Sequence, residues 1–195
     1  MKTQILRIDF MSYWQSSSGE SGQGDDDILP LTEDCGLPMI GARTVQGLLR
    51  DAARWVNEFK ADQFQVDQWF GATDSESFKE IRCYNATIPD SDQVAEVARA
   101  YFKKFQRPLP ELAGFFQSIS FTALRDSLAV NKTLRKVRWV IPTTLEAPIE
   151  FRGEEGIPKD FETVILPAVR RVGLRRHRGF GRCQMTLINV EGGDQ

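Results

Sequence analysis

Period-2 and period-3.6 hydrophobic patterns alternate along this chain in an order that few folds accommodate. Residues 2–14 place Leu6, Ile8 and Phe10 on one face, which predicts a strand. The later patterns predict, in order, a helix from Val45, a strand at 80–88, a long bent strand or hairpin at 134–151, a helix at 159–172 and a strand at 182–190. With residues 90–133 set aside, this order is β-α-β-β-α-β, that of a ferredoxin-like α+β fold with two helices on one sheet.

Two segments lie outside this order. Residues 16–36 are polar and rich in glycine, which predicts a loop. Residues 90–133 begin with an amphipathic helix at 92–105 and then mix prolines, aromatic and basic residues without one clear period. Because 195 residues suit a single domain, we expect one domain over residues 1–195 with an insertion at about 90–133.

The composition excludes several classes of protein. Hydrophobic residues make up 41% and charged residues 27%, as in soluble globular chains, and no apolar run approaches the length of a membrane span. The N-terminus lacks a signal-peptide pattern. Cys35, Cys83 and Cys183 are widely spaced and form no CxxC pair, which argues against disulfides or a zinc site. We therefore expect a cytoplasmic protein without a membrane partner.

The net charge of −2 conceals two oppositely charged segments. Residues 16–34 contain six acidic residues and no Lys or Arg, whereas residues 168–182 contain six arginines and no acid. Local fields govern binding more than net charge does. A solvated helix end is one explanation for the arginines, but the intervening Gly173, Gly179 and Gly181 are unfavourable in a helix.

The stretch "GLRRHRGFGR" precedes the last predicted strand. Glycine allows close approach of the backbone to a phosphate, successive amides form anion-binding turns, and guanidinium groups bind phosphate oxygens bidentately. The candidate RNA-binding residues here are Arg175, Arg176, His177, Arg178, Gly179, Phe180, Gly181 and Arg182. Phe180 either stacks on a base or fills the protein core, and the sequence leaves both possibilities open.

The start of the first helix is a second candidate anion site. A helix N-terminus presents unpaired N–H groups and partial positive charge, and Thr44 is the expected N-cap. The candidate residues are Arg43, Thr44, Gln46, Gly47 and Arg50. An ordinary capped helix is the alternative. Since the predicted order makes the first helix and the last strand neighbours, we expect both segments to line one groove for a polynucleotide backbone.

Together, "GLPMIGARTVQGLLRDAA" and "VGLRRHRGFGR" resemble the two signature motifs of the RAMP superfamily of CRISPR-associated proteins, particularly the backbone subunit of type III effector complexes. The matching positions are Pro38, Ile40, Gly47, Arg50, Gly173, Arg178, Gly179, Gly181 and Arg182. Gln46 stands where that subunit has a lysine and Arg43 where it has a serine, so we expect Arg43 to supply the charge. The resemblance covers nearly the whole chain and implies a modified RRM-type fold, with residues 90–133 as a thumb-like insertion.

The resemblance also implies a function. The chain would bind guide RNA in a type III CRISPR antiviral ribonucleoprotein, with target RNA, other Cas subunits and further copies of itself as partners. In cleaving members, an aspartate before the first motif supports metal-dependent endoribonuclease cleavage of the paired target RNA. Counting back twelve positions from Pro38 gives Asp26 as catalytic residue and ligand of Mg²⁺ or another divalent cation, with Asp25 and Asp27 as rivals.

Three other functions stay open at this stage. One is a non-cleaving RAMP subunit that caps the guide RNA. Another is a metal-independent guide-processing endoribonuclease, for which His177, the single histidine, would be the general base. The last is a ferredoxin-like protein with no nucleic-acid role. Salt-dependent binding of RNA would exclude this last class.

Overall fold

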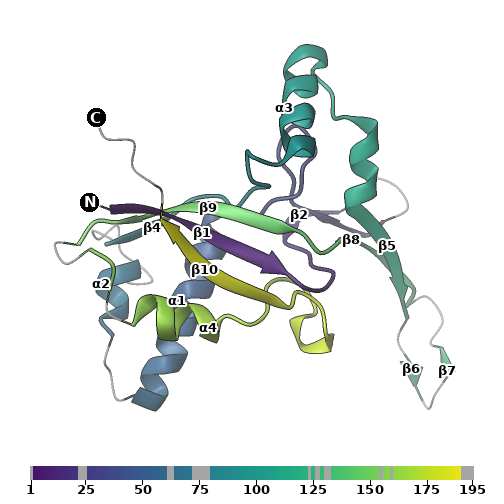
Figure 1. The fold of residues 1–195 in the computed structure, drawn as a ribbon. Coiled ribbons are helices and arrows are strands. Elements are labelled where there is room, and N and C mark those ends of the chain that lie inside the picture. The colour runs from purple at the N-terminus through teal and green to yellow at the C-terminus, as the bar shows by residue number, and fades with distance from the viewer. Residues whose placement is uncertain are drawn as a thin grey trace.

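Two four-stranded sheets form the framework of the chain (Figure 1). The computed structural model describes residues 2–21, 26–60, 64–71, 80–122, 124–125, 128–129, 133–153, 156–158 and 160–189. The protein is α+β, as predicted from the sequence. Within these ranges, no helix combines the length and the apolar character needed to cross a membrane.

The first sheet has the strand order β10-β1-β9-β4, and each neighbouring pair is antiparallel. Its strands are β1 Lys2–Phe10, β4 Ile81–Cys83, β9 Thr144–Phe151 and β10 Cys183–Asn189. The predicted alternation along β1 is confirmed, because Leu6 and Ile8 are fully buried whereas Arg7 and Asp9 are partly exposed. The sheet therefore has one face that must be covered by helices.

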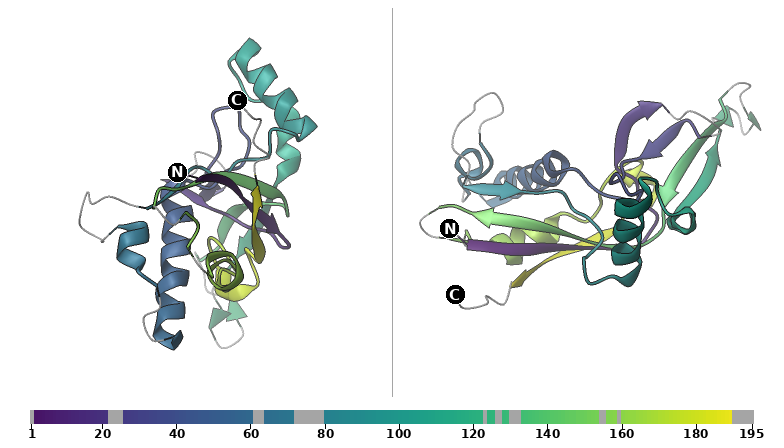
Figure 2. Two further views of the ribbon diagram at one scale, coloured as in Figure 1. Left: turned by 60° about the vertical axis from the view of Figure 1, so that its left-hand side comes forward. Right: turned by 90° about the horizontal axis from the view of Figure 1, so that it is seen from above.

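Helix α1, Ala42–Lys60, covers that face together with the shorter helix α4, Leu166–Ala168 (Figures 1 and 2). The buried stripe of α1 contains Val45, Leu49, Ala53 and Val56, at the helical spacing expected from the sequence. A short helix, α2 Val66–Phe70, follows α1 and packs beside it through Trp69 and Phe70.

The helix predicted at 159–172 is much shorter than expected. A π-helical turn at Phe161–Ile165 leads into α4, and the chain becomes extended at Val169. Pro167 lies in the first turn of α4, where its missing N–H is tolerated, and so the proline accompanies a new helix start rather than a kink. The long-helix prediction was wrong because apolar spacing alone does not reveal where the backbone leaves the helix.

The second sheet has the order β2-β3-β8-β5. Its strands are β2 Ser17–Ser21, β3 Ile28–Pro30, β5 Phe116–Phe121 and β8 Arg135–Val140. β3 and β8 are parallel, whereas the other neighbours are antiparallel. Strands β2 and β3 correct the prediction of a loop at 16–36. They carry no local strand pattern because the pairing that stabilises them is to a distant segment, with Ile28 opposite Val137.

The predicted strand or hairpin at 134–151 is two strands that belong to different sheets. β8 ends at Val140 and β9 begins at Thr144, with Pro142 in the connection. Proline cannot donate a hydrogen bond to a neighbouring strand, so the connection marks the change of sheet. The chain thus passes from the second sheet into the first at this point.

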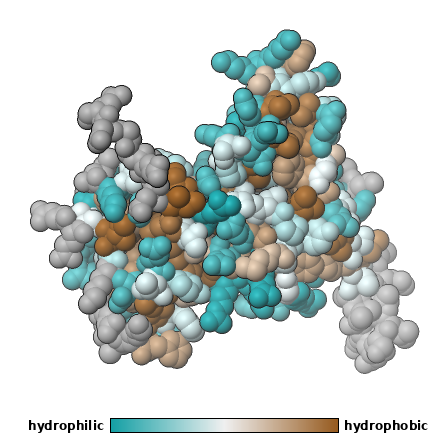
Figure 3. Space-filling model, viewed as in Figure 1, coloured by the Kyte–Doolittle hydropathy of each residue, from teal (hydrophilic) through white to brown (hydrophobic). Residues whose placement is uncertain are grey.

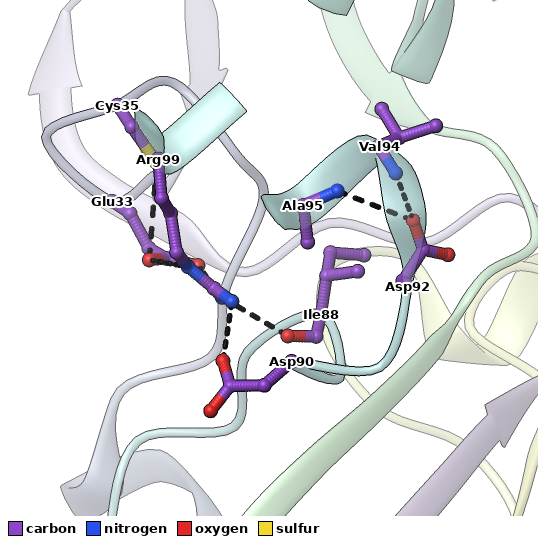
Figure 4. Close-up of polar contacts among 8 residues, drawn as sticks. All are labelled: Glu33, Cys35, Ile88, Asp90, Asp92, Val94, Ala95 and Arg99. Atoms are coloured by element: carbon purple, nitrogen blue, oxygen red, sulfur yellow. Dashed lines mark hydrogen bonds and ion pairs between the residues drawn. The ribbon is translucent and has the colours of Figure 1, made fainter. Parts of the chain in front are cut away.

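The insertion contains helix α3, Gln93–Phe105, and a 3₁₀ turn, Pro110–Phe115, before β5. A small two-stranded unit, β6 Leu124–Arg125 and β7 Leu128–Ala129, lies at the far end of the second sheet (Figure 1). Asp92 caps α3 by accepting hydrogen bonds from the backbone N–H groups of Val94, at 2.8 Å, and Ala95, at 3.2 Å (Figure 4).

Arg99 fixes α3 to the segment that precedes α1 (Figure 4). Its Nη2 lies 2.9 Å from Oε1 of Glu33, and its Nη1 lies 2.5 Å from Oδ1 of Asp90. It also donates to the carbonyl of Ile88 at 3.0 Å. The hydrogen bond to Glu33 raises the pKa of Arg99. Part of the acid-rich segment therefore serves to hold the base of the insertion.

Helix α1 begins earlier than the sequence predicted. The carbonyl of Gly41 accepts hydrogen bonds from the N–H groups of Thr44 and Val45, and the N–H of Ala42 donates to Oδ1 of Asn85 at 2.8 Å. Thr44 therefore lies inside the first turn, and the prediction that it is the N-cap was wrong. The side chain that accepts a hydrogen bond from this helix N-terminus is Asn85, in the segment after β4. The local sequence of α1 cannot indicate a partner so far along the chain.

Candidate nucleic-acid interface

Residues 173–182, called the Arg loop here, are held by the segment that follows β1. The N–H of Leu174 donates to the carbonyl of Gln15 at 3.0 Å, and the N–H of Gly181 donates to the carbonyl of Tyr13 at 2.7 Å. The N–H of Arg182 donates to Oγ of Ser12 at 2.9 Å. These bonds fix both ends of the loop on one support, so its shape is built into the fold.

Two glycines are required for this close approach. Gly173 has φ +91°, and a Cβ there would lie 2.0 Å from the carbonyl oxygen of Gln15. Gly181 has φ +68°, and a Cβ there would lie 1.8 Å from the carbonyl oxygen of Val172. Both conformations favour glycine, and both contacts are with backbone that cannot move aside. By contrast, Gly179 has φ +91° with open space around it.

Aromatic contacts join the Arg loop to the second sheet. The ring of Phe180 stacks on Trp139 of β8 with centroids 4.0 Å apart, and the guanidinium of Arg175 lies 4.0 Å from the ring centroid of Phe121 on β5. Phe180 is thus half-buried and packs on Trp139, while its role toward a base stays a prediction. Phe121 and Trp139 were not expected as part of this site, because their approach to the loop is purely tertiary.

The outer surface of the Arg loop is cationic. Arg176, His177 and Arg178 form a 3₁₀ turn and are exposed, as is Arg182. Arg170 and Arg171, just before the loop, are exposed too, and Arg171 donates to the carbonyl of Arg176 at 2.9 Å. Among the described residues, no carboxylate lies within ion-pair distance of these arginines. A rigid surface of this kind attracts anions, because its charge is not neutralised internally.

The candidate residues at the start of α1 are arranged differently. Arg43 and Thr44 are exposed, but Nε2 of Gln46 donates to the carbonyl of Phe70 at 3.1 Å and so has an internal partner. Arg50 is half-buried, and its Nε has no hydrogen-bond partner within the described part of the chain. An added Cβ on Gly47 would meet nothing within 4 Å. Arg43 and Thr44 are thus the accessible members of this set.

The two predicted segments adjoin opposite edges of the first sheet. α1 starts beside the segment after β4, through the bridge between Ile40 and Ala86, whereas the Arg loop leads into β10. β4 and β10 are the two outer strands of the first sheet. No hydrogen bond or ion pair between described residues joins 41–50 to 173–182. The prediction that they line a single groove therefore has no support from hydrogen bonds or ion pairs between the described residues, although both segments lie on the helix-covered side of the sheet (Figures 1 and 2).

Asp26 is a buried, hydrogen-bonded residue of the second sheet. Its side chain is 8% exposed, and its Oδ2 lies 3.2 Å from Nε of Arg138 and accepts from Oγ of Ser118 at 3.0 Å. Its Oδ1 is buried without a partner among the described residues. Asp27 is exposed, and its Oδ2 accepts from the N–H of Lys136 at 2.8 Å. Asp25 lies outside the described residues.

These carboxylates do not fit a resident divalent cation at Asp26. Magnesium binds carboxylate oxygens and retains several waters, whereas one oxygen of Asp26 is occupied by the guanidinium of Arg138 and the hydroxyl of Ser118. In the described ranges, no three His, Cys, Asp or Glu side chains are grouped to hold a metal ion. Asp26 is therefore part of an ion pair that ties β3 to β5 and β8.

Asp26 and the Arg loop lie on opposite faces of the second sheet. Ser118 is paired with Arg138 across β5 and β8, so both side chains project to the face of Asp26. Trp139 follows Arg138 directly and projects to the other face, where Phe180 stacks on it. An RNA strand lying on the Arg loop would thus be separated from Asp26 by the sheet.

Comparison with solved structures identifies chains of the same fold. In a cryo-EM structure of Type III-B Cmr-beta bound to cognate target RNA, one chain matches with a TM-score of 0.67 and 10% sequence identity, over 96% of this chain and 97% of that one. In the apo state of Type III-B Cmr-beta, one matches with a TM-score of 0.66 and 10% identity, over 97% of this chain and 98% of that one. No protein-family model matches the sequence, and no curated protein matches it. The chain therefore shares the fold of a type III effector subunit, in agreement with the resemblance of its motifs.

Proposed function

We propose that this chain binds the sugar–phosphate backbone of a guide RNA as a subunit of a type III CRISPR effector complex. The observation that carries the proposal is the Arg loop, a glycine-dependent loop that is fixed to residues 12–15 and exposes arginines with no acidic partner among the described residues. Guanidinium groups held in this way bind phosphates regardless of base sequence. The fold shared with chains of Type III-B Cmr-beta supports the same assignment.

The first sheet supports an RRM-type arrangement within this proposal. If β1, β4, β9 and β10 are counted as the four strands of a β-α-β-β-α-β unit, their spatial order is 4-1-3-2. α1 and α4 then occupy the two helix positions. The insertion at 90–133 would serve as the thumb, which contacts a neighbouring subunit or the RNA. Apolar surface on the projecting α3 region is consistent with burial against a partner (Figure 3).

Cleavage of a paired target RNA is the part of the resemblance that the geometry favours least. Asp26, the residue in register with the catalytic position, is held by Arg138 and faces away from the Arg loop. This observation favours the second candidate, a subunit that holds guide RNA without cutting. If the chain does cut with Mg²⁺ or another divalent cation, Asp27 is the better candidate of Asp26 and Asp27, because its carboxylate is exposed.

Binding of single-stranded RNA at a series of salt concentrations tests the main proposal. Each phosphate neutralised on a single strand contributes about 0.7 to the slope of log K against log salt. Replacement of Arg175, Arg176 and Arg178 together by glutamine should therefore reduce the magnitude of this slope by about 2. The loss should be the same for all sequences, because phosphate contacts do not read bases. Binding equal to that of the wild-type chain would refute the proposal.

Activity separates the two versions of the function. Asp25→Ala, Asp26→Ala and Asp27→Ala variants should be assembled singly with guide RNA and the other subunits and given paired target RNA and Mg²⁺. Unchanged cleavage in all three, or no cleavage by the wild-type complex, supports a non-cutting subunit. Loss of cleavage in one variant identifies the catalytic carboxylate. Cleavage of precursor RNA in EDTA that requires His177 would instead support guide processing.

A further inference from the structure

A groove of about 540 Å³ is lined by the first residues of β10, by the segment that leaves α4 and by Met11. Its volume is within the range of small-molecule binding sites. Arg170, Arg171 and Arg182 lie at its rim and are exposed. No acidic residue lines it, so the groove combines three positive charges with no internal counter-ion in the described part of the chain.

The floor of the groove is apolar. Cys183 and Met185 project into it from β10 and are 6% and 4% exposed. Burial raises the pKa of the Cys183 thiol to about 12, so the floor adds no negative charge that would oppose an anion. Met11 is also in the lining and is 50% exposed, so it offers an apolar surface beside the three cations.

These two properties together indicate the chemistry of the ligand. Three guanidinium groups suit a phosphodiester, but a bare phosphate would leave the exposed thioether of Met11 in water. A nucleotide satisfies both features, since its phosphate is anionic and its base has flat, weakly polar faces that pack on an apolar side chain. An acidic peptide would pair with the arginines and would leave the apolar floor unused.

The groove is continuous with the Arg loop. Arg182 is the last residue of the loop and part of the groove rim, and Arg171 of the rim donates to the carbonyl of Arg176 in the loop. The N–H of Met11 donates to the carbonyl of Arg182, which places both sides of the groove on one hydrogen-bonded support. A strand bound to the Arg loop would therefore lie next to the groove.

We propose that this groove holds one unstacked nucleotide of the bound single-stranded RNA, with its phosphate between Arg170, Arg171 and Arg182 and its base against Met11. The inference rests on the proposed RNA-binding function and extends that site beyond the Arg loop. It adds Arg170, Arg171 and Met11 to the residues that contact RNA.

Methyl NMR of the full chain labelled with ¹³C-methyl methionine provides a direct test. On titration with a short oligoadenylate, the Met11 signal should shift and saturate. Met11→Leu assigns the resonance. The Arg170→Gln/Arg171→Gln variant should abolish the Met11 shift and lower the salt slope by about 1.4, since each neutralised phosphate on a single strand contributes about 0.7.

Affinity measurements separate the base contact from the phosphate contacts. Met11→Ala should weaken oligoadenylate binding about fivefold, the lower end of the range for base stacking, while the salt slope stays unchanged. Leu134→Ala and Arg82→Gln are matched controls, because both wild-type side chains are exposed and lie outside the groove. Neither control should change the affinity or the Met11 signal.

The outcomes distinguish this inference from the function on which it rests. If the Arg loop variant loses RNA binding but oligoadenylate leaves Met11 unmoved in the wild-type chain, the groove proposal is wrong and the proposed function stands. If the wild-type chain binds no RNA, both are wrong. A polyglutamate peptide that shifts Met11 when oligoadenylate does not would identify the groove as a protein-binding site and overturn the inference.

Discussion

Replacing Asp26 by alanine tests whether this residue is structural or catalytic. The change removes, at one carboxylate oxygen, a hydrogen bond from Ser118 at 3.0 Å and an ion pair with Arg138 at 3.2 Å. Hydrogen bonds to charged groups contribute about 1.5–3 kcal/mol each, and breaking a fully buried ion pair costs about 3–5 kcal/mol. Two features of the site reduce these values.

The first feature is that the Arg138 side chain is 47% exposed, so it regains water when its partner is lost. The second is that Oδ1 of Asp26 is buried without a partner among the described residues, and alanine removes this unfavourable group, worth about 1–3 kcal/mol. We therefore expect a net destabilisation of about 1–2 kcal/mol. For a chain of 195 residues this corresponds to a fall in Tm of about 2–8 °C.

Thermal unfolding followed by circular dichroism measures this effect. In a double-mutant cycle with Arg138→Gln, the coupling energy should be about 1 kcal/mol, since each variant removes the same ion pair. Asp27→Ala is the matched control, because Asp27 is exposed and its loss should cost less than about 1 kcal/mol. A variant at Asp26 with unchanged Tm and abolished target cleavage would refute the structural assignment and restore the catalytic one.

Three further predictions concern other parts of the molecule. Gly181→Ala should lower the unfolding free energy by at least about 3 kcal/mol and weaken RNA binding, because its Cβ would meet the backbone of Val172 at 1.8 Å. Gly47→Ala in α1 is the control and should raise the unfolding free energy by about 0.5–1 kcal/mol, because an added Cβ there meets nothing. Chemical denaturation measures both values. Burial raises the pKa of Cys83 and Cys183 to about 12, so both thiols should resist alkylation at pH 8, which mass spectrometry measures. In the unfolded chain these thiols lose their protons near pH 9. The unfolding free energy should therefore fall between pH 9 and 12 by about 1.4 kcal/mol per pH unit for each thiol. Val97→Glu, on the exposed side of α3, should leave the Tm within about 2 °C but reduce co-purification with partner subunits, and equal assembly would contradict a role of α3 in contacts.

Parts of the candidate site could be read from local sequence, because they depend on the intrinsic properties of a few residues. Glycines among arginines at 173–182 indicated a tight cationic loop, and Gly173 and Gly181 do adopt positive φ. The supports of that loop were missed, since Tyr13 and Gln15 contact it from a segment more than 150 positions earlier. Met11 gave no signal at all, because exposure of an apolar residue cannot be read from its neighbours in sequence.

Asp26 shows the limit of reasoning by register. Its spacing from Pro38 matched a catalytic position, but spacing along the chain carries no information about which side chains will surround a residue. Its partners are distant in the chain: Ser118 is in β5, within residues 90–133, and Arg138 is in β8, which follows them. Similarly, β2 and β3 were expected to be loop because their backbone hydrogen bonds are satisfied by β8 and by each other, not by any pattern of their own.

The amino-acid sequence alone determined the order of strands and helices around the first sheet, the buried stripe of α1 and the position of the cationic loop, since hydrophobic periodicity and glycine conformations act over a few residues. Tertiary structure alone decided the existence of the second sheet, the burial of Asp26, the stacking of Phe180 and the edges of the first sheet at which the two predicted RNA-binding segments lie. Each of these depends on pairing between residues distant in the chain, and such pairing is chosen by the packing of the whole molecule.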